Sequence, residues 1–95
     1  MSPAIVVRHN SAAQRYETEM DGHRAVTEYR MEGNTVIFHH TFVPPELRGR
    51  GVAEALVKAA LEETRDQGRH VIAQCSYVAK FLQRHPEFQA LLADE

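Results

Sequence analysis

Apolar and polar residues alternate along the first part of the chain, a pattern typical of strands with one buried face. We expect strands over residues 4–7 and 14–20, with a turn at 10–13 between them. Asp21-Gly22 follows, and this dipeptide between alternating segments predicts a tight hairpin turn that pairs Met20 with His23. The hairpin then has one apolar and one solvated face. The apolar face carries Tyr16, Thr18, Met20, Ala25, Thr27 and Tyr29; the charged face carries Arg15, Glu17, Glu19, Arg24, Glu28 and Arg30, with Val26 as its exception.

The next segment, residues 35–43, is apolar on both faces, so we place it at the centre of the sheet. Gly33 marks the turn before it, and Pro44 and Pro45 end it because proline cannot donate to a ladder. Strict alternation predicts two sets of side chains. Val36, Phe38, His40 and Phe42 share one face, and Ile37, His39, Thr41 and Val43 share the other.

An amphipathic helix is predicted over residues 52–67, where apolar residues recur at spacings of three and four. Gly68 ends it. A strand follows over residues 70–75, and a strand, helix, strand order favours a right-handed crossover to a parallel neighbour. We expect Ser76 to cap a short helix over 77–84, and Pro86 to open a last helix over 87–93. The apolar stripe of the long helix is Ala53, Leu56, Val57, Ala60 and Leu61, and the last helix would pack through Phe88, Leu91 and Leu92.

Together these elements predict one α/β (α+β) domain over residues 1–95, in which an antiparallel meander feeds a strand-helix-strand unit and then short helices. The net charge of −2 gives no support to a nucleic-acid or membrane-surface partner. A single cysteine excludes an internal disulfide and a cysteine-rich zinc site, and no histidine spacing suggests a metal site. We therefore expect no metal, a reducing cytoplasmic setting, and no membrane span, because no apolar run approaches ~20 residues.

The joint between strand and helix, residues 42–53, has the features of an anion site. The first N–H groups of a helix lack partners within it, and the helix dipole favours negative charge there. Gly49 and Gly51 would let a phosphate approach the main chain, while Arg48 and Arg50 would add charge-assisted hydrogen bonds. The segment lacks the spacing of a nucleotide P-loop and the third glycine of the dinucleotide fingerprint. The alternative is a glycine-rich helix start that binds no ligand.

The pattern Arg48-x-x-Gly51-x-Ala53 before a long helix resembles the acyl-CoA pyrophosphate loop of the GNAT acetyltransferase superfamily. The segments His40-Thr-Phe-Val-Pro-Pro-Glu-Leu-Arg-Gly-Arg-Gly-Val-Ala-Glu-Ala-Leu-Val, Cys75-Ser-Tyr-Val and Phe81-Leu-Gln-Arg-His-Pro resemble its small single-domain members. The resemblance implies a compact GNAT-like fold that holds CoA or acetyl-CoA where two parallel strands splay apart. It also implies that the main chain of Phe42 and Val43 pairs with the pantetheine arm. The residues implied to hold the pyrophosphate are Arg48, Gly49, Arg50, Gly51, Val52 and Ala53.

Three residues are candidates for the chemistry. The resemblance indicates Cys75 as an active-site residue, and a thiol at a helix N-terminus or beside a histidine ionises more readily; the alternative is a buried inert thiol. His40 is a candidate base on the central strand, or else a structural histidine. Tyr77 lies near the place where larger GNAT enzymes often have a tyrosine that protonates the departing CoA thiolate. Lys80 and Arg84 are cations near the CoA phosphates, or simply solvated.

The expected function is transfer of an acetyl group from acetyl-CoA to an unidentified amine, directly or through acetyl-Cys75. The alternative is a CoA-binding regulatory or interaction module with little or no catalysis. Larger GNAT enzymes carry an N-terminal helical region that helps to form the acceptor pocket, whereas strand-like sequence fills most of this chain before Pro44. The acceptor side is therefore expected to be open or completed by a partner. We expect a monomer or a weak homodimer.

Overall fold

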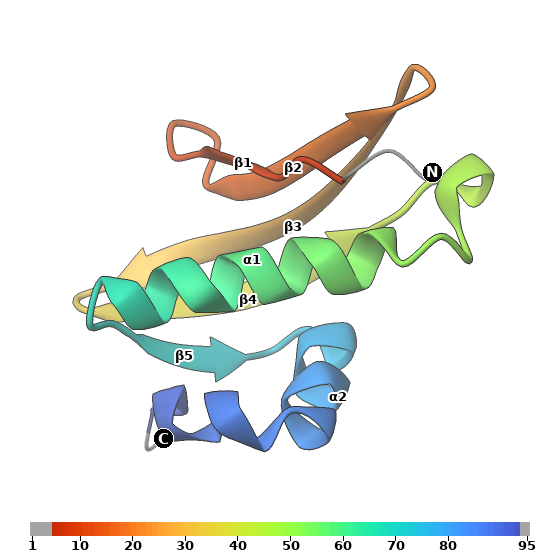
Figure 1. Ribbon diagram of the computed structural model, residues 1–95. Coiled ribbons are helices and arrows are strands. Elements are labelled where there is room, and N and C mark those ends of the chain that lie inside the picture. Colours follow the sequence, from red (N-terminus) through yellow and green to blue (C-terminus); the bar gives the residue numbers. More distant parts are fainter. Residues whose placement is uncertain (1–4, 94–95) are drawn as a thin grey trace.

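A computed structural model describes residues 5–93, and its core is one five-stranded sheet with the strands in chain order, β1 to β5 (Figure 1). Neighbouring strands are antiparallel except for β5, which runs parallel to β4. The predicted meander and strand-helix-strand unit are therefore confirmed. The elements are β1 Arg8–Asn10, β2 Arg15–Met20, β3 His23–Glu32, β4 Thr35–Phe42, the 3-10 helix η1 Pro45–Leu47, α1 Val52–Asp66, β5 His70–Ala73, α2 Ser76–Arg84 and the 3-10 helix η2 Pro86–Leu91.

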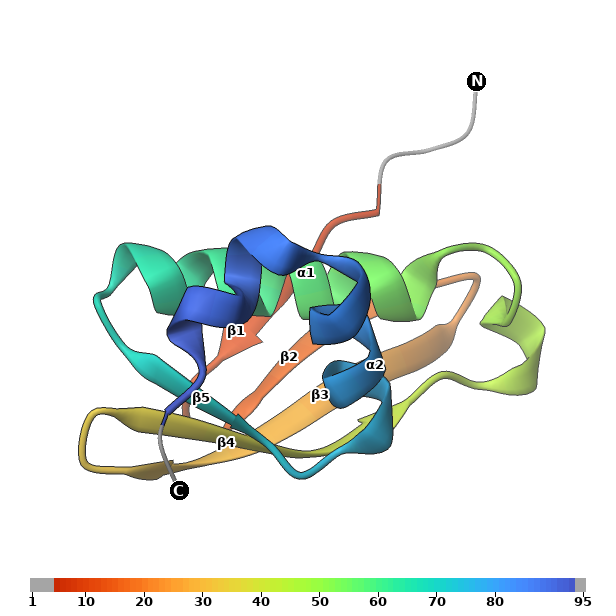
Figure 2. The ribbon, with the colours of Figure 1, turned by 90° about the horizontal axis from the view of Figure 1, so that it is seen from below.

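All the helices that pack on the sheet lie on one of its faces. In Figure 2, α1, α2 and η2 lie on the same side of the strands, and none of the described elements covers the other side. The predicted stripe of α1 is largely confirmed, since Leu56, Val57, Ala60 and Leu61 are buried. They join buried side chains of the strands, of α2 and of η2 in one core. Among the described residues no helix is long and apolar enough to cross a membrane.

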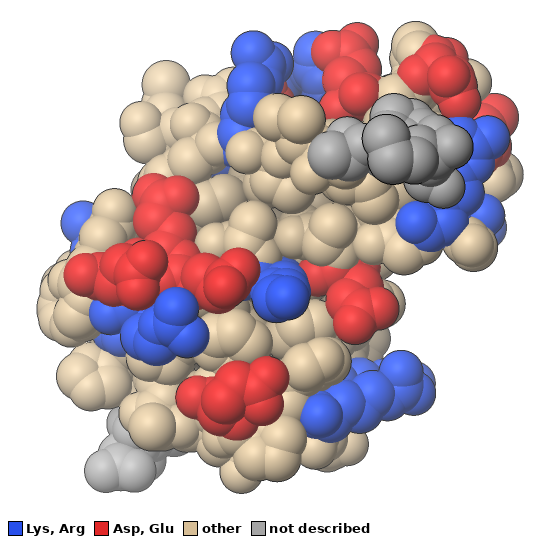
Figure 3. All heavy atoms as spheres, viewed as in Figure 1, with Lys and Arg blue, Asp and Glu red and all other residues tan. Residues whose placement is uncertain are grey.

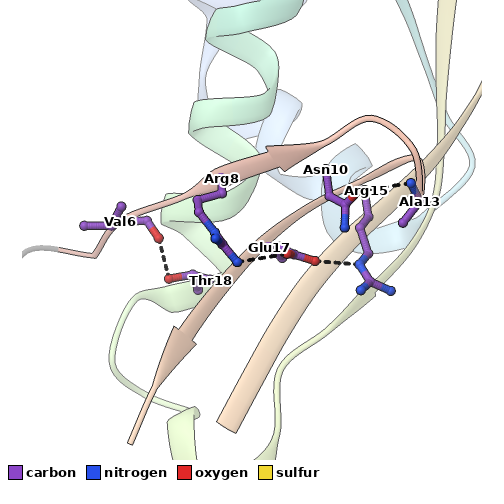
Figure 4. A network of polar contacts seen from close by, with 7 residues as sticks. All are labelled: Val6, Arg8, Asn10, Ala13, Arg15, Glu17 and Thr18. Atoms are coloured by element: carbon purple, nitrogen blue, oxygen red, sulfur yellow. Dashed lines mark hydrogen bonds and ion pairs between the residues drawn. The ribbon is translucent and has the colours of Figure 1, made fainter. Parts of the chain in front are cut away.

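The Asp21-Gly22 hairpin has the predicted register, with Met20 opposite His23. Its apolar face is buried as expected, including Tyr16 and Tyr29. Glu17 differs from the prediction of a solvated face, because it is only 6% exposed. Its carboxylate accepts from Arg15 at 2.7 Å and from Arg8 at 3.3 Å (Figure 4). The hydrogen bond from Arg15 is the main cause that lowers the pKa of Glu17.

The first strand is not where the apolar run predicted it. Ala4 lies outside the described residues, and residues 5–7 are not in a strand. β1 is instead the polar segment Arg8–Asn10, paired with β2. The hydroxyl of Thr18 donates to the Val6 carbonyl at 2.7 Å, which holds the preceding segment against β2 (Figure 4). The backbone of β2 therefore pairs with the polar segment 8–10 rather than with the apolar run before it. The apolar side chains of Ile5 and Val7 pack against the core without forming a strand.

The largest error in register falls in β4. Tyr29 pairs with Phe38 but Glu28 pairs with His40, so that His39 is an extra residue without a partner on β3. Such a β-bulge reverses the alternation beyond it, because residues paired across two strands share a face. Thr41 thus lies on the helix-covered face with Phe38, while His40 lies on the open face. The predicted grouping of His40 and Phe42 with Val36 and Phe38 is wrong.

The C-terminal elements differ from prediction in three details. β5 ends at Ala73, two residues early, because the N–H groups of both residues 74 and 75 donate to the Phe38 carbonyl at 2.9 Å. Cys75 is the N-cap of α2, and Ser76 is already helical, so Ser76 does not cap it. The last helix is the 3-10 segment η2 rather than an α-helix; Phe88 is buried, but Leu92 is 44% exposed.

Tyrosine burial predicts that the protein loses stability in alkali. Burial raises the pKa of Tyr16 and of Tyr29 above the ordinary value of 10.0, and the Glu63 carboxylate adds to this in both cases. As pH rises past about 10, the unfolded chain loses these protons while the folded chain keeps them. The free energy of unfolding must then fall. Urea unfolding between about pH 8 and pH 11 measures the fall, and Tyr16→Phe should make it shallower. An unchanged slope in that variant would contradict the assignment.

Candidate functional site

The N-terminus of α1 presents backbone donors that have no acceptor in the helix. Its first helical bond runs from the Ala55 N–H to the Gly51 carbonyl at 3.0 Å. The N–H groups of Val52, Ala53 and Glu54 therefore lack intrahelical acceptors. Gly51 is the N-cap with a φ of 76°, and no side chain caps the helix. A left-handed N-cap suits glycine, and the uncapped turn keeps its donors available to an anion.

A cleft of about 420 Å³ opens beside this helix start, and we call it the β4–α1 cleft. It contains every residue predicted to bind the cofactor except Arg50. A Cβ built on Gly49 or Gly51 would meet no atom within 4 Å, so the space over this turn is open. The segment predicted to bind an anion therefore lies along a cleft. The cleft is lined by Thr41, Phe42, Val43, Leu47, Arg48, Gly49, Gly51, Val52, Ala53, Glu54 and Tyr77.

The two arginines of the loop have different surroundings. Arg48 lines the cleft, and its Nε donates to the Val43 carbonyl at 3.0 Å. That hydrogen bond holds the guanidinium group of Arg48 at the cleft wall. Arg50 instead forms an ion pair with Asp21 of the β2–β3 turn, at 2.8 Å between Nη1 and Oδ2. Both partners are solvent-exposed, so the pair contributes little to stability. The structure brings Arg48 to the candidate site and ties Arg50 to the neighbouring hairpin.

β4 and β5 separate where the bulge occurs. Their last paired residues are Phe38 and Ala73, and β4 continues through residues 39–42 without β5 beside it. The chain after β5 turns away at once into α2. The resulting gap lies at the inner side of the β4–α1 cleft, since Thr41 and Phe42 line the cleft and both come from the unpaired part of β4. The predicted splay of the parallel strands is therefore present, and the bulge accompanies it.

Cys75 lies at this gap. It is the N-cap of α2 and is partly buried. Its thiol donates to Thr41 Oγ1 at 3.4 Å, which links the start of α2 to the cleft wall. Cys75 therefore lies at a helix N-terminus rather than at the end of a strand. His40 is not brought to the thiol, because the bulge turns it to the open face of the sheet, where it is exposed.

Tyr77 reaches the cleft from the first turn of α2 and is 38% exposed. Burial raises the pKa of its phenol above the ordinary value of 10.0, the nearby Glu54 carboxylate raises it further, and Arg84 opposes both. The phenol is consequently protonated across the neutral range. A proton donor at the mouth of a cleft can serve a leaving group on which negative charge develops.

A smaller cleft of about 260 Å³ adjoins the first and shares Glu54 and Tyr77 with it. Its other walls come from α2 and the residue after it, and include the cations Lys80 and Arg84. His85 Nε2 lies 3.8 Å from Glu54 Oε1, which places the carboxylate between the two clefts. Lys80 and Arg84 thus lie next to the main cleft without lining it. Within residues 5–93 no group of three or more side chains could hold a metal ion.

Sequence reasoning missed two polar residues of the site, Thr41 and Glu54. Alternation assigned Thr41 to the wrong face, and the only local signal for the bulge is the polar pair His39-His40 inside an apolar strand. Glu54 lies outside the apolar stripe of the helix, and the one sequence signal for it is an acidic residue in the first turn. Figure 3 shows acidic and basic side chains interspersed over the face that α1 presents, without a field of one sign.

Comparison with known proteins gives consistent results. A family model described as GCN5-related N-acetyl-transferase matches residues 15–91. Protein NATD1 of Xenopus tropicalis is 33% identical over 88 residues, covering 90% of this chain and 81% of that protein. Protein NATD1 of Bos taurus is 33% identical over 85 residues, with 86% and 75% covered. An NMR structure of a GCN5-like protein from Staphylococcus aureus superimposes with a TM-score of 0.74 at 26% identity, covering 96% of this chain and 90% of that one.

Proposed function

The chain belongs to the GCN5-related N-acetyltransferase family, and we propose that it binds acetyl-CoA in the β4–α1 cleft and transfers the acetyl group to an amine. The observation that carries this proposal is the uncapped start of α1, which turns three unpaired N–H groups toward an open, glycine-walled cleft. Backbone N–H groups at a helix start are suited to bind a pyrophosphate, because they point at the ligand and the helix dipole favours negative charge. Arg48 adds the fixed positive charge at the same wall.

The remaining cofactor contacts follow from the splay of the strands. Phe42 and Val43 line the cleft where β4 has no β5 neighbour, so the edge of β4 that faces the gap is the place where the main chain would pair with the amides of the pantetheine arm. The Val43 carbonyl already accepts a hydrogen bond from Arg48 Nε. That arm would run from the start of α1 toward Thr41, Cys75 and Tyr77. The acetyl thioester would then lie at the gap between β4 and α2. Lys80 and Arg84 are close enough to the cleft mouth to attract the outer phosphate of CoA.

In the direct route the acceptor nitrogen attacks the thioester carbonyl carbon, a C–N bond forms and the C–S bond breaks. The proton on the attacking nitrogen passes to a base, and the Tyr77 phenol gives a proton to the departing thiolate. We propose His40 as that base only for an amine that enters from the open face of the sheet, since that is where its ring lies. In the covalent route Cys75 receives the acetyl group first and passes it to the amine, which would give ping-pong kinetics.

The second candidate is a CoA-binding module without turnover. One observation favours it: none of the described residues that precede β4 is helical, so no helix from this part of the chain covers the open face of the sheet. Both candidates require the same ligand in the same cleft. They differ in whether an amine gains the acetyl group.

Three measurements test the proposal. Calorimetry with CoA should show saturable binding of one ligand per chain, and no binding would exclude both candidates. A panel of amines, with detection of released CoA thiol, should reveal turnover; binding without release across the panel would favour the module. Intact mass after incubation with acetyl-CoA should show one acetyl group on Cys75 if the covalent route operates, and Cys75→Ala should lose it.

The two arginines of the loop should differ in their contribution to CoA affinity. Arg48→Gln removes a charge that lines the cleft and should weaken CoA binding about tenfold, as expected for one charge-assisted hydrogen bond. Arg50→Gln removes a charge already paired with Asp21 and should change the affinity by about twofold or less. Calorimetry on the two variants compares them directly. A larger loss in Arg50→Gln would mean that the ion pair opens to the ligand.

A further inference from the structure

Glu54 is the third residue of α1, and it is the only acidic residue among the described residues that line the β4–α1 cleft. An acidic side chain at this helix position can reach back and accept a hydrogen bond from the N–H group of the N-cap residue, as it does in a capping box. The N-cap here is Gly51, beside the N–H groups that are proposed to bind the pyrophosphate. The Glu54 carboxylate is therefore an internal anion that is able to compete with the cofactor for the start of α1.

In the structure this carboxylate is turned away from the helix start. No side chain caps α1, and Glu54 Oε1 instead lies 3.8 Å from His85 Nε2. Both residues line the smaller cleft between α1 and α2. His85 is the only ion-pair partner of Glu54 within residues 5–93. The position of the carboxylate is thus linked to the charge of this one imidazole ring.

The His85 ring is held so that only its protonated form can donate to Glu54. Its Nδ1 lies 2.9 Å from the Phe81 carbonyl oxygen, and the ring stacks on that of Phe81 with centroids 3.9 Å apart. A carbonyl oxygen only accepts hydrogen bonds, so Nδ1 carries a hydrogen whether the ring is charged or neutral. In the neutral ring Nε2 then presents a lone pair to the carboxylate, and in the protonated ring it presents an N–H donor.

Histidine is the side chain that ordinarily changes charge between pH 5 and pH 8. The other charged or titratable side chains around the two clefts are of types that ordinarily keep their charge state between pH 6 and pH 8. They are Arg48 of the loop before α1, Lys58 one turn further along α1, Tyr77, Lys80 and Arg84 of α2, and Glu87 in the first turn of η2. The contact between Glu54 and His85 is therefore expected to form at pH 6 and to be lost at pH 8.

We propose that Glu54 and His85 form a pH-dependent latch that regulates access of CoA to the start of α1, an inference that rests on the cofactor site proposed above. Protonated His85 holds the Glu54 carboxylate on the side of the smaller cleft, which leaves the N–H groups of the first turn to the pyrophosphate. Neutral His85 releases the carboxylate, which then occupies those donors and repels the cofactor. CoA therefore binds more tightly at pH 6 than at pH 8.

The first test is calorimetry with CoA at pH 6 and pH 8 on the wild type, Glu54→Gln, His85→Phe and the double variant. Comparing variants at one pH cancels the titration of CoA itself. Glu54→Gln should tighten binding about threefold to fivefold at pH 8, the size expected for one exposed charge, and less at pH 6. His85→Phe keeps the stack on Phe81 but lacks Nε2, so it should weaken binding by a similar factor at pH 6 and have no effect at pH 8.

The double variant separates the latch from direct attraction between protonated His85 and the cofactor. If His85 acts through Glu54, His85→Phe should not change the affinity when residue 54 is already glutamine. A loss at pH 6 that is equal in both backgrounds overturns the proposal, and so does a gain from Glu54→Gln that is the same at both pH values. Glu54→Ala replaces the glutamine variant if that one does not fold.

The second test needs no cofactor. In NMR spectra of the free ¹⁵N-labelled chain, the amide signals of residues 51–54 should move between pH 6 and pH 8 as the carboxylate reaches the helix start. They should stay in place in Glu54→Gln and in His85→Phe. Signals that do not move in the wild type, or that move equally in Glu54→Gln, overturn the latch whether or not CoA binds. Failure of the wild type to bind CoA while these signals move would contradict the proposed function alone.

Discussion

Gly51→Asp is expected to abolish measurable CoA binding while leaving the chain folded. Gly51 has a φ of 76°, and aspartate tolerates this left-handed region better than most residues. A Cβ there would meet no atom of the protein within 4 Å, so the substitution creates no clash in the free chain. It does put a carboxylate beside the N–H groups of Val52 and Ala53. A like charge about 4 Å from a phosphate costs about 4 kcal/mol near a protein surface, so the affinity should fall by a factor on the order of 100 or more.

Gly51→Asn is the matched control. Asparagine has nearly the same shape and also tolerates the left-handed region, but it carries no charge. Its affinity for CoA should therefore fall far less than that of Gly51→Asp, and the ratio of the two dissociation constants isolates the electrostatic part. Equal affinities in the two variants would show that the anion does not lie at the start of α1. Thermal unfolding of both variants confirms that the comparison is made between folded chains.

Tyr77→Phe is expected to reduce the rate of acetyl transfer by about two orders of magnitude without weakening CoA binding. The phenyl ring keeps the cleft wall, whereas the substitution removes the hydroxyl that we propose as the proton donor for the departing thiolate. A positioned general acid typically contributes about 10²–10⁴-fold. Because the pKa of Tyr77 is raised above 10.0, the wild-type chain should keep this phenol protonated throughout the neutral range.

The measurement is kcat and KM for the best amine of the panel, over a range of pH. A fall in kcat with an unchanged CoA affinity assigns Tyr77 to chemistry. Loss of affinity with kcat unchanged would make Tyr77 only a wall of the cleft. Tyr77→Ala serves as the second variant, since it removes the wall together with the hydroxyl and should affect both constants.

Much of this site could be predicted because its features are local in sequence. The two glycines and the arginine before an amphipathic stripe define a helix start, and the helix begins at the predicted Val52. The Asp21-Gly22 turn fixes the register of β2 against β3 without help from the rest of the chain. Each of these signals depends on the backbone preferences of a few neighbouring residues.

The residues that were predicted wrongly depend on partners far along the chain. The bulge at His39 arises from the pairing of β4 with β3 on one side and its separation from β5 on the other, and strict alternation cannot reveal either. The bulge moved both His40 and Thr41 to the face of the sheet opposite to the one predicted. Glu17 is buried only because arginines of β1 and β2 bracket its carboxylate (Figure 4). Residues 5–7 looked like a strand because they are apolar, yet β2 pairs with the polar segment after them.

An NMR titration of the ¹⁵N-labelled chain with CoA tests the proposed cofactor site most directly. The amide signals of Val52, Ala53 and Glu54 should shift most, saturating at one CoA per chain, and those of Phe42 and Val43 should move with them. Signals from β1 and from the C-terminal half of α1 should stay in place. Shifts confined to other parts of the sheet, or none at a CoA concentration of about 1 mM, would contradict the claim that the β4–α1 cleft binds the cofactor.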